Sequence, residues 1–440
     1  MKRNFESYLE EWKNRKSRKP LIVRGARQIG KTYTIEEFGK KNFKDVIKVN
    51  FEEKPELKEF FKTNDIDSIL TNLTAYFGRS ATDVKTLLFL DEIQQCPQAI
   101  AGLRYFYEHR PKLHIIAAGS LLDHVLNEIN YSMPVGRVEF AYMHPLNFFE
   151  FLDAMGEEGL TGFLNSYEPW KKISPPIHDK LLKLVRMYYF IGGMPEAVRE
   201  YRDSKDLIEV ERIHESILRS LELDFSKYGT KAQQETLVTV LRYIPTGLGR
   251  KIKYVNIDPN KRSDALRTAF KLLEMSRIAG LVNHTSADGI PLEQGQNDRI
   301  TKPLFLDIGL ANHVLKLRLT DIDDLITVNE GSLAEQFVGQ QMLSTEPYYL
   351  DPKLYYWMRE AKNSNAELDF VTEYNNKIVP IEVKAGKSGT LRSLQVFMKE
   401  KKLKTALRFN ADQPSKTTGN YDLISLPLYL SPLYRKFIDA

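Results

Sequence analysis

The stretch that most constrains this chain is GARQIGKT, residues 25–32, which matches the spacing G-x-x-x-x-G-K-[ST]. The apolar residues 21–23 predict a buried strand before it, and a helical pattern follows it. Glycines at positions 25 and 30 allow a turn whose N–H groups point inward, and the start of a helix adds positive potential there. Such a loop surrounds phosphate groups. We therefore expect Lys31 to reach the β- and γ-phosphates of ATP, and the Thr32 hydroxyl to hold Mg²⁺.

The bulk composition limits the class of protein. A chain of 440 residues is too long for one core, so we expect several domains. Its net charge of +5 permits a nucleic-acid partner without requiring one. The single cysteine, Cys96, rules out an internal disulfide and fits a reducing compartment. No apolar run approaches the roughly 20 residues that span a bilayer, and the first residues lack a signal-peptide core, so we expect a cytoplasmic protein without a membrane partner.

Two acidic residues follow a short, fully apolar run. LLFL, residues 87–90, predicts a buried parallel strand, and Asp91 and Glu92 come directly after it. The carboxyl end of such a strand is where nucleotide chemistry takes place in an open α/β sheet. We expect Asp91 to bind Mg²⁺, directly or through water, and Glu92 to polarise the attacking water. The alternative is an acidic pair that faces solvent.

Three further polar residues lie beside expected strands. Asn50 ends the strand in VIKVNF and could hold Glu92 through a hydrogen bond. Ser120 follows the strand in LHIIAAG and would lie beside the γ-phosphate; both residue types are also routine caps of strand ends. Arg137 follows a glycine and precedes a strand, so it could act as an arginine finger across the boundary of a homo-oligomer. The alternative for Arg137 is a surface salt bridge.

A family resemblance rests on these motifs. GARQIGKT, LLFLDEIQQCP, AAGS, VGRVEFAYMHPLNFFEFL and the later IGGMPEAV resemble the AAA+-type ATPases of a prokaryotic family that carries a C-terminal restriction-endonuclease-like domain of unknown function. The resemblance implies an ATPase of the P-loop class with ATP and Mg²⁺ as cofactors. The expected nucleotide-binding residues are Gly25, Ala26, Arg27, Gln28, Ile29, Gly30, Lys31, Thr32, Tyr33, Asn50 and Ser120.

The expected fold class is α/β, with four domains. An N-terminal P-loop ATPase domain with a parallel sheet covers residues 1–157, and a helical lid and connector covers residues 158–230. A winged-helix-like domain follows over residues 231–326, with two helices and a β-hairpin wing. Its basic residues could contact DNA phosphates. The sequence shows no pattern of side chains that would recognise particular bases, so it favours a packing role for this domain. These basic residues are Lys251, Lys253, Lys261, Arg262, Arg267 and Lys271.

The last expected domain, residues 327–440, holds a second chemical signal. ELDFVTEYNNKIVPIEVK, residues 367–384, predicts a hairpin that turns at Asn375 and Asn376, since this pair tolerates positive φ. If the hairpin loop consists of these two residues, Asp369 lies opposite Glu382, and Glu367 lies opposite Lys384. Opposed carboxylates repel one another, and a divalent cation would remove that cost.

This second pattern resembles the PD-(D/E)xK nuclease fold. The resemblance suggests Asp369 and Glu382 as ligands of Mg²⁺, and Glu335, on an expected helix, as an accessory ligand. Lys384 would activate water or stabilise the pentavalent phosphate. Leu368 replaces the proline of the pattern. A solvated strand face of mixed charge, or a nuclease fold retained for binding without cutting, are the alternatives.

Three hypotheses about function follow. The first is an ATPase whose nucleotide state controls a C-terminal, Mg²⁺-dependent nuclease acting on DNA or RNA. The second is an ATP-driven switch or adaptor that binds nucleic acid or a partner protein without cutting it. The third is an ATP-dependent transcriptional regulator, which rests on the winged-helix pattern alone.

Overall fold

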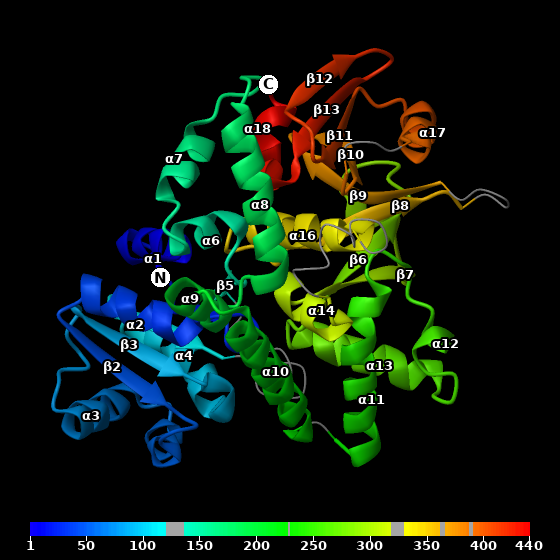
Figure 1. Cartoon of the computed structure of the whole chain (residues 1–440). Helices are drawn as coiled ribbons and strands as arrows, with labels where there is room; N and C mark the ends of the chain where they lie inside the picture. The colour runs from blue at the N-terminus through cyan, green and yellow to red at the C-terminus, as the bar shows by residue number, and fades with distance from the viewer. Residues whose placement is uncertain (120–135, 228, 318–329, 361–365, 387–389) are drawn as a thin grey trace. The chain divides into compact units, whose positions relative to one another are not determined.

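The computed structural model describes residues 1–119, 136–227, 229–317, 330–360, 366–386 and 390–440 (Figure 1). Ser120 lies outside the described residues. The chain forms two compact units, which are considered one at a time. Unit 1 contains residues 1–145, 275–277 and 346–351, and unit 2 contains the remaining residues from 146 onward.

Unit 1 is an open α/β structure around a parallel sheet. Its strands are β1 (Leu21–Arg24), β2 (Asp45–Asn50), β3 (Thr86–Asp91), β4 (His114–Ala118) and β5 (Glu139–Tyr142). Its helices are α1 (Phe5–Asn14), α2 (Lys31–Asn42), α3 (Ile66–Phe77) and α4 (Pro97–His109), with short 3₁₀ turns η1 (Pro55–Phe61) and η2 (Ile93–Gln95). The sheet order is β2-β3-β4-β1-β5, and every pairing is parallel. The expected N-terminal parallel sheet is confirmed.

Burial on both faces explains why the central strands β3 and β4 are largely apolar. All six residues of β3 and all five of β4 are buried. Alternate residues such as Ile47, Leu88 and Leu90 pack in one cluster with α3 and α4. Because β1 and β3 lie on either side of β4, their carboxyl ends meet at one edge of the sheet.

The first part of unit 2 is helical. It contains α6 (Phe148–Ala154), α7 (Glu158–Ser166), α8 (Pro175–Ile191), α9 (Pro195–Ser204), α10 (Leu207–Asp224), α11 (Lys231–Tyr243), α12 (Tyr254–Ile257) and α13 (Ser263–Met275), with the 3₁₀ turns η3 (Phe225–Lys227) and η4 (Ile244–Gly247). The long helices α8, α10 and α11 are seen in green in Figure 1. The helical middle of the chain is as expected, since its apolar residues recur with the helical period.

The IGGMPEAV motif is a tightly packed break between α8 and α9. Gly192 has φ 71°, and a Cβ atom there would lie 1.9 Å from Asp307 Oδ1, so only glycine fits. Asp307 is fully buried and its carboxylate accepts hydrogen bonds from the backbone N–H groups of Gly193, Gly309 and Leu310. Pro195 begins α9 as a first-turn proline, as the sequence predicts. The motif therefore has a structural role.

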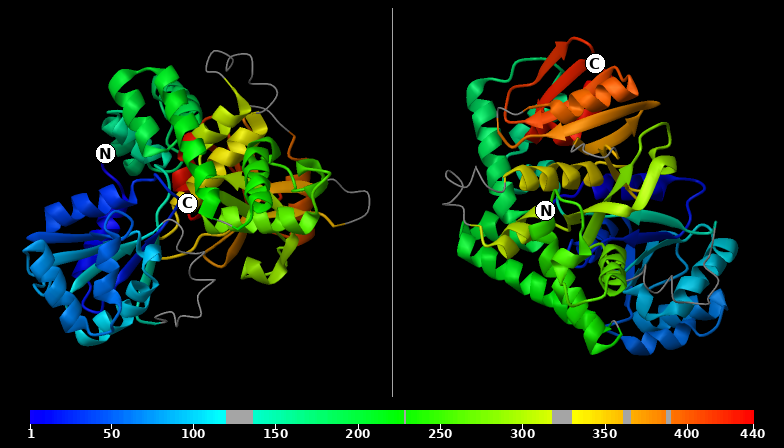
Figure 2. Two further views of the ribbon diagram at one scale, coloured as in Figure 1. Left: turned by 90° about the horizontal axis from the view of Figure 1, so that it is seen from below. Right: turned by 90° about the vertical axis from the view of Figure 1, so that its right-hand side faces the viewer.

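A mixed sheet of eight strands organises the rest of unit 2 (Figure 2). The strand order is β12-β13-β11-β10-β9-β8-β6-β7. These strands are β6 (Ala279–Thr285), β7 (Gln296–Phe305), β8 (Leu354–Met358), β9 (Glu367–Tyr374), β10 (Lys377–Val383), β11 (Thr405–Asn410), β12 (Ser415–Thr418) and β13 (Asp422–Pro427). The helices are α14 (Ile308–Leu315), α16 (Glu330–Ser344), α17 (Arg392–Lys401) and α18 (Tyr434–Ile438), with η5 (Leu292–Gly295) and η7 (Leu428–Leu433).

Two details of this sheet bear on the sequence-based predictions. The hairpin expected as a wing forms as β6 and β7, but β6 also pairs in parallel with β8, so the hairpin continues the C-terminal sheet. The turn at Asn375 and Asn376 has φ of 47° and 58°, as expected. The predicted register of β9 and β10 is confirmed from the pair Tyr374–Lys377 to the pair Phe370–Ile381. Within the described residues, no helix combines the length and apolar character needed to cross a membrane.

Candidate functional sites

The phosphate loop, residues 25–32, joins β1 to α2 at the carboxyl edge of the unit 1 sheet. Gly25 has φ 149° and Gly30 has φ 89°, and Gln28 adopts the left-handed region with φ 63°. A Cβ atom on Gly25 would lie 2.4 Å from the carbonyl oxygen of Met143. The loop thus needs glycine where the sequence has it, and its backbone has the sharp turns that aim N–H groups at a phosphate.

Lys31, the first residue of α2, is buried inside this loop. Its Nζ atom donates hydrogen bonds to the carbonyl oxygens of Gly25, at 2.9 Å, and Ala26, at 2.6 Å. Burial lowers the pKa of Lys31 to about 8, although the charges of Glu92 and Asp91 act in the opposite direction. The ammonium therefore sits where an anion would stabilise it, which is the requirement for binding phosphate.

Thr32 and Asp91 come together as the expected magnesium-binding pair. Thr32 Oγ1 lies 3.2 and 3.1 Å from the two carboxylate oxygens of Asp91. Burial, followed by the charge of Glu92, raises the pKa of Asp91. Lys48 on β2 was not predicted from the sequence; its Nζ lies 3.6 Å from Asp91 Oδ2 and 2.6 Å from Glu36 Oε1. Adjacent hydroxyl and carboxylate oxygens are hard donors, so this pair fits Mg²⁺.

Glu92 lies just past β3, in the left-handed region at φ 51°. Its Oε2 atom accepts a hydrogen bond from Nε2 of Gln94, a residue that is 6% exposed. The prediction that Asn50 holds Glu92 is wrong. Asn50 pairs with Asp91 in the strand register, and its amide lies 3.4 Å from Asp91 Oδ2 because Glu92 has already turned away from the strand. The Asn50 Oδ1 atom accepts from the backbone N–H groups of the next turn.

Arg137 lies on the surface of unit 1. Its Nε atom is 3.0 Å from Glu108 Oε1, and the side chain is 45% exposed. Arg104, one turn away from Glu108 on α4, pairs with the same oxygen at 3.1 Å. The guanidinium therefore forms the surface salt bridge that was the alternative to an arginine finger. Tyr33, on α2, is 55% exposed.

The second candidate site, in unit 2, is a cluster of four carboxylates. We call Glu335 on α16, Glu367 and Asp369 on β9, and Glu382 on β10 the carboxylate cluster. One member of the site, Lys302 on β7, is not among the residues predicted from the sequence. Its Nζ atom lies 2.6 Å from Glu367 Oε1 and 3.6 Å from Glu335 Oε2, and the residue is 2% exposed. Its sequence signal is a lysine inside the otherwise apolar end of a strand, ITKPLF.

The chain's own donors also engage the other two carboxylates. Asp369 Oδ2 accepts a hydrogen bond of 2.7 Å from the backbone N–H of Val383. Glu382 Oε1 lies 2.6 Å from Nζ of Lys384, so the expected catalytic lysine pairs with an expected ligand.

The electrostatics of the cluster reflect burial and crowding. Burial, then the charge of Asp369, raises the pKa of Glu335, and the same two causes raise the pKa of Glu382 to about 7. Burial also raises the pKa of Asp369, against the charge of Lys302. Although burial disfavours the ammonium of Lys302, the charges of Glu335, Asp369 and Glu367 raise its pKa overall. Burial and mutual repulsion therefore disfavour the charged carboxylates, and the charge of Lys302 offsets part of that effect.

This arrangement does not fit the expected metal site. Across the residues that the structure describes, no three carboxylate, imidazole or thiol side chains are placed so that they could hold a metal ion together. Glu335, Asp369 and Glu382 act on one another through their charges. One oxygen of each already lies near a donor of the chain: Lys302, the N–H of Val383 and Lys384, respectively.

The basic residues of the middle region are partly used in packing. The guanidinium of Arg267 lies over the ring of Tyr254, with 5.6 Å to the ring centroid. Lys261 donates to Thr236 at 3.1 Å, and Lys251 lies 3.9 Å from Glu367 Oε2.

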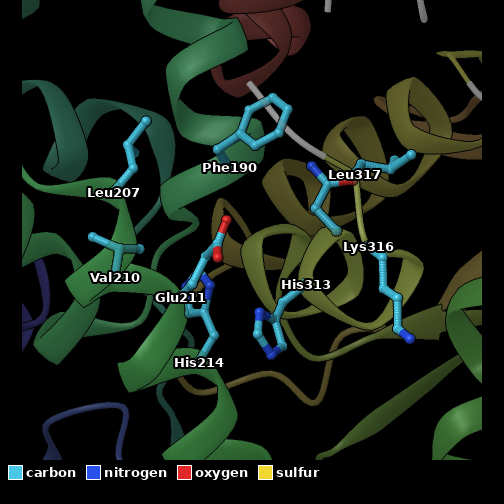
Figure 3. Close-up of a pocket in the computed structure, with 9 residues that line it drawn as sticks. Phe190, Leu207, Val210, Glu211, His214, His313, Lys316 and Leu317 are labelled. Carbon is cyan, nitrogen blue, oxygen red and sulfur yellow. The ribbon is translucent and has the colours of Figure 1, made fainter. Parts of the chain in front are cut away.

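A cavity of about 230 Å³ lies between α8, α10 and the end of α14 (Figure 3). Its polar side chains include His214 and His313, from α10 and α14. His214 Nε2 donates to the carbonyl oxygen of Ile191 at 3.0 Å, and His313 Nε2 lies 3.1 Å from Glu215 Oε2. Burial lowers the pKa of His214 to about 4, so this imidazole is neutral at pH 7. Since both imidazoles have partners within the protein, we link the cavity to no ligand.

Comparison with known families agrees with the assignment of unit 1. Residues 17–152 match the model of an AAA domain. Residues 182–321 and 330–429 match two domains of unknown function, DUF8612 and DUF4143. The N-terminal region is therefore an AAA-type, ATPase-like domain, whereas the C-terminal match brings no activity with it. None of the curated proteins that were compared with the chain matches it.

Three of the solved structures that match this chain come from Pyrococcus abyssi and Aeropyrum pernix. The Walker-type ATPase PABY2304 of Pyrococcus abyssi has 17% identity and a TM-score of 0.47, over 71% of this chain and 95% of that chain. The Aeropyrum pernix ORC1 protein in complex with DNA has 11% identity and a TM-score of 0.31, over 71% and 90%. The Aeropyrum pernix ORC2 protein has 12% identity and a TM-score of 0.35, over 73% and 93%. TM-scores this low support no conclusion about this chain.

Proposed function

We propose that this chain is a Mg²⁺-dependent ATPase whose nucleotide state controls how its C-terminal domain engages nucleic acid. The observation that carries the first half is the meeting of Thr32 with Asp91, 3.1 Å apart, beside the buried ammonium of Lys31. A hydroxyl, a carboxylate and an ammonium at the carboxyl edge of a parallel sheet form a set suited to a nucleoside triphosphate.

Each residue of the site has a specific role in this proposal. The N–H groups of the phosphate loop bind the phosphate oxygens, and Lys31 exchanges its two carbonyl partners for the β- and γ-phosphates. Thr32 and Asp91 would hold Mg²⁺, and the ion would neutralise charge on the phosphates. Glu92 accepts a proton from the attacking water, and Gln94 orients its carboxylate.

The test is ATP turnover by the purified protein. Lys31→Ala should abolish turnover, and Glu92→Gln should bind ATP but lose at least about 100-fold in kcat, the usual contribution of a general base. Lys40→Ala is the matched control, because Lys40 lies on the same helix but is exposed and pairs with Glu37. Equal turnover in the wild type, Lys31→Ala and Glu92→Gln would refute the assignment.

For the C-terminal domain, the geometry favours binding without cutting over cleavage. The supporting observation is Lys302, whose ammonium lies beside Glu367 and Glu335. Its positive charge also acts on Asp369 and Glu382, where a nuclease would need its metal ion. We infer an ATP-driven adaptor that holds a nucleic acid, with the nuclease function as the competing proposal.

Binding and cleavage can be separated in one experiment. Labelled DNA and RNA are incubated with the full chain and ATP, ADP or no nucleotide, in Mg²⁺ or Mn²⁺. The adaptor function predicts nucleotide-dependent binding that survives Asp369→Ala and Lys384→Ala, with no shortened products. Metal-dependent products that disappear in Asp369→Ala would establish the nuclease instead.

The proposed arginine finger requires a second copy of the chain. Arg137 would have to leave Glu108 and reach a phosphate bound by the neighbouring subunit. Sedimentation with and without a non-hydrolysable ATP analogue, for the wild type and Arg137→Ala, tests this. Assembly with ATP but unchanged turnover in Arg137→Ala would leave Arg137 as a surface salt bridge.

A further inference from the structure

Among the lysine and arginine residues that the structure describes, Lys302 is the most deeply buried, and the proposed ATPase mechanism does not use it. The residue is 2% exposed, at the apolar end of β7, and its Nζ atom also lies 4.9 Å from the centroid of the Tyr356 ring. Burying an isolated ammonium costs many kcal/mol, so a lysine persists at such a position only when anionic groups surround it. The carboxylate cluster provides these anions.

Lys302 interacts with the cluster as a whole. Glu367 Oε1 and Glu335 Oε2 lie 2.6 and 3.6 Å from its Nζ atom. Its charge also acts on Asp369 and Glu382, which lie on the neighbouring strands β9 and β10. One ammonium thus lies beside two carboxylates and acts through its charge on the other two, so it supplies positive charge that a divalent cation would otherwise supply.

One oxygen of Asp369 and one of Glu382 are held by donors of the chain itself. The N–H of Val383 takes Asp369 Oδ2, and Lys384 takes Glu382 Oε1. A metal ion bound by Asp369 and Glu382 would compete with these donors for the carboxylates and would be repelled by the charge of Lys302.

We infer that the ammonium of Lys302 is the resident cation of the carboxylate cluster, so that this domain keeps the cluster folded without a divalent metal ion. This inference rests on the proposal that the C-terminal domain binds nucleic acid without cutting it. A carboxylate cluster whose charge is balanced by Lys302 needs no metal ion, and this supports binding without cleavage. One oxygen, Glu382 Oε2, is buried without a hydrogen-bond partner, and it marks where a metal ion would bind if the inference were wrong.

The direct test is a Mn²⁺ titration of the nucleotide-free full chain, followed by electron paramagnetic resonance. We expect the Asp369→Asn variant to bind as much Mn²⁺ as the wild type. Any Mn²⁺ that Thr32→Ala removes belongs to the phosphate loop and leaves the inference standing. A bound Mn²⁺ that disappears in Asp369→Asn or Glu382→Gln, and persists in Thr32→Ala, would overturn it.

A second measurement compares two lysines that share one carboxylate. Lys302→Met leaves the buried carboxylates without their cation, so we expect the melting temperature to fall by about 10 °C, and Mn²⁺ to restore part of that loss. The matched control is Lys251→Met, since Lys251 lies 3.9 Å from the same Glu367 and is 35% exposed, so its loss should cost about 2 °C or less. Equal effects of the two substitutions would contradict the inference.

These outcomes stay separate from those of the ATPase proposal. If Lys302→Met does not fold, the Mn²⁺ titration of the wild type and Asp369→Asn still decides the question. If the protein hydrolyses no ATP, the ATPase proposal fails, but the titration is carried out without nucleotide and keeps its meaning.

Discussion

Gly25→Ala tests the geometry of the phosphate loop most directly. The new Cβ atom would lie 2.4 Å from the carbonyl oxygen of Met143 and 2.5 Å from Cδ1 of Ile29. The isoleucine can rotate away, but the carbonyl belongs to the backbone beside β5, which is bonded to β1 through the N–H of Met143 and the carbonyl of Arg24. The alanine therefore cannot be accommodated by a change of side chain alone.

The magnitude follows from two costs. An alanine at φ 149° occupies a region that is almost restricted to glycine, which costs about 1–3 kcal/mol. Overpacking against a fixed neighbour adds about 1–3 kcal/mol. If the loop holds its shape, the free energy of unfolding falls by the sum, about 2–6 kcal/mol. If the loop moves instead, its N–H groups no longer aim at the phosphates, and a loss of about 2 kcal/mol weakens ATP binding roughly 30-fold.

Two assays on one preparation capture both outcomes. Calorimetric titration gives the Kd for ATP, and denaturant unfolding gives the free energy of unfolding. Gly102→Ala is the matched control, because a Cβ atom on this glycine within α4 meets nothing within 4 Å. That substitution should stabilise the protein by about 0.5–1 kcal/mol. Gly25→Ala with ATP affinity within threefold of the wild type and unchanged unfolding would refute the reasoning.

Three further predictions concern other buried groups. The pKa of His214 is about 4 in the folded protein, below its ordinary value of 6.5. Its contribution to the free energy of unfolding is therefore complete above pH 6.5 and decreases as the pH falls, by about 2 kcal/mol at pH 5. His214→Gln should flatten this pH dependence in denaturant unfolding. Asp307→Ala leaves buried N–H groups without an acceptor and should cost about 3 kcal/mol in the same assay, whereas Asp307→Asn should cost less. Thr32→Ala should raise the Mg²⁺ concentration that half-saturates ATP turnover by roughly tenfold, an effect absent in Thr71→Ala, whose hydroxyl is exposed on α3.

The local parts of this protein are predictable because each depends on a few neighbouring residues. The strand, loop and helix around residues 25–32 follow from an apolar run, two glycines and a helical pattern. The hairpin of β9 and β10 follows from Asn375 and Asn376, which adopt the positive φ that its turn requires. In both cases the chemistry that selects the structure lies within about twenty residues of sequence.

The contacts that decide function at the second site lie beyond that range. Lys302 belongs to β7 and Glu367 to β9, and the strands β6 and β8 lie between them in the sheet order. The pairing of adjacent strands does not predict that these two side chains meet. Their contact depends on the arrangement of all the strands in the sheet. The error at Asn50 has a smaller cause, since a single residue of left-handed backbone at Glu92 changes which carboxylate Asn50 faces.

The two buried lysines show how the surroundings of a charge indicate its use. Lys31 donates to two neutral carbonyl oxygens, and burial lowers its pKa to about 8, so an anionic ligand would stabilise its charge. Lys302 lies among ionisable carboxylates that raise its pKa, so its charge is already matched within the protein. A buried ammonium whose direct partners are neutral is suited to bind an anion, whereas a buried ammonium beside carboxylates is part of the fold. On this criterion ATP belongs at the phosphate loop, and the carboxylate cluster holds its own cation.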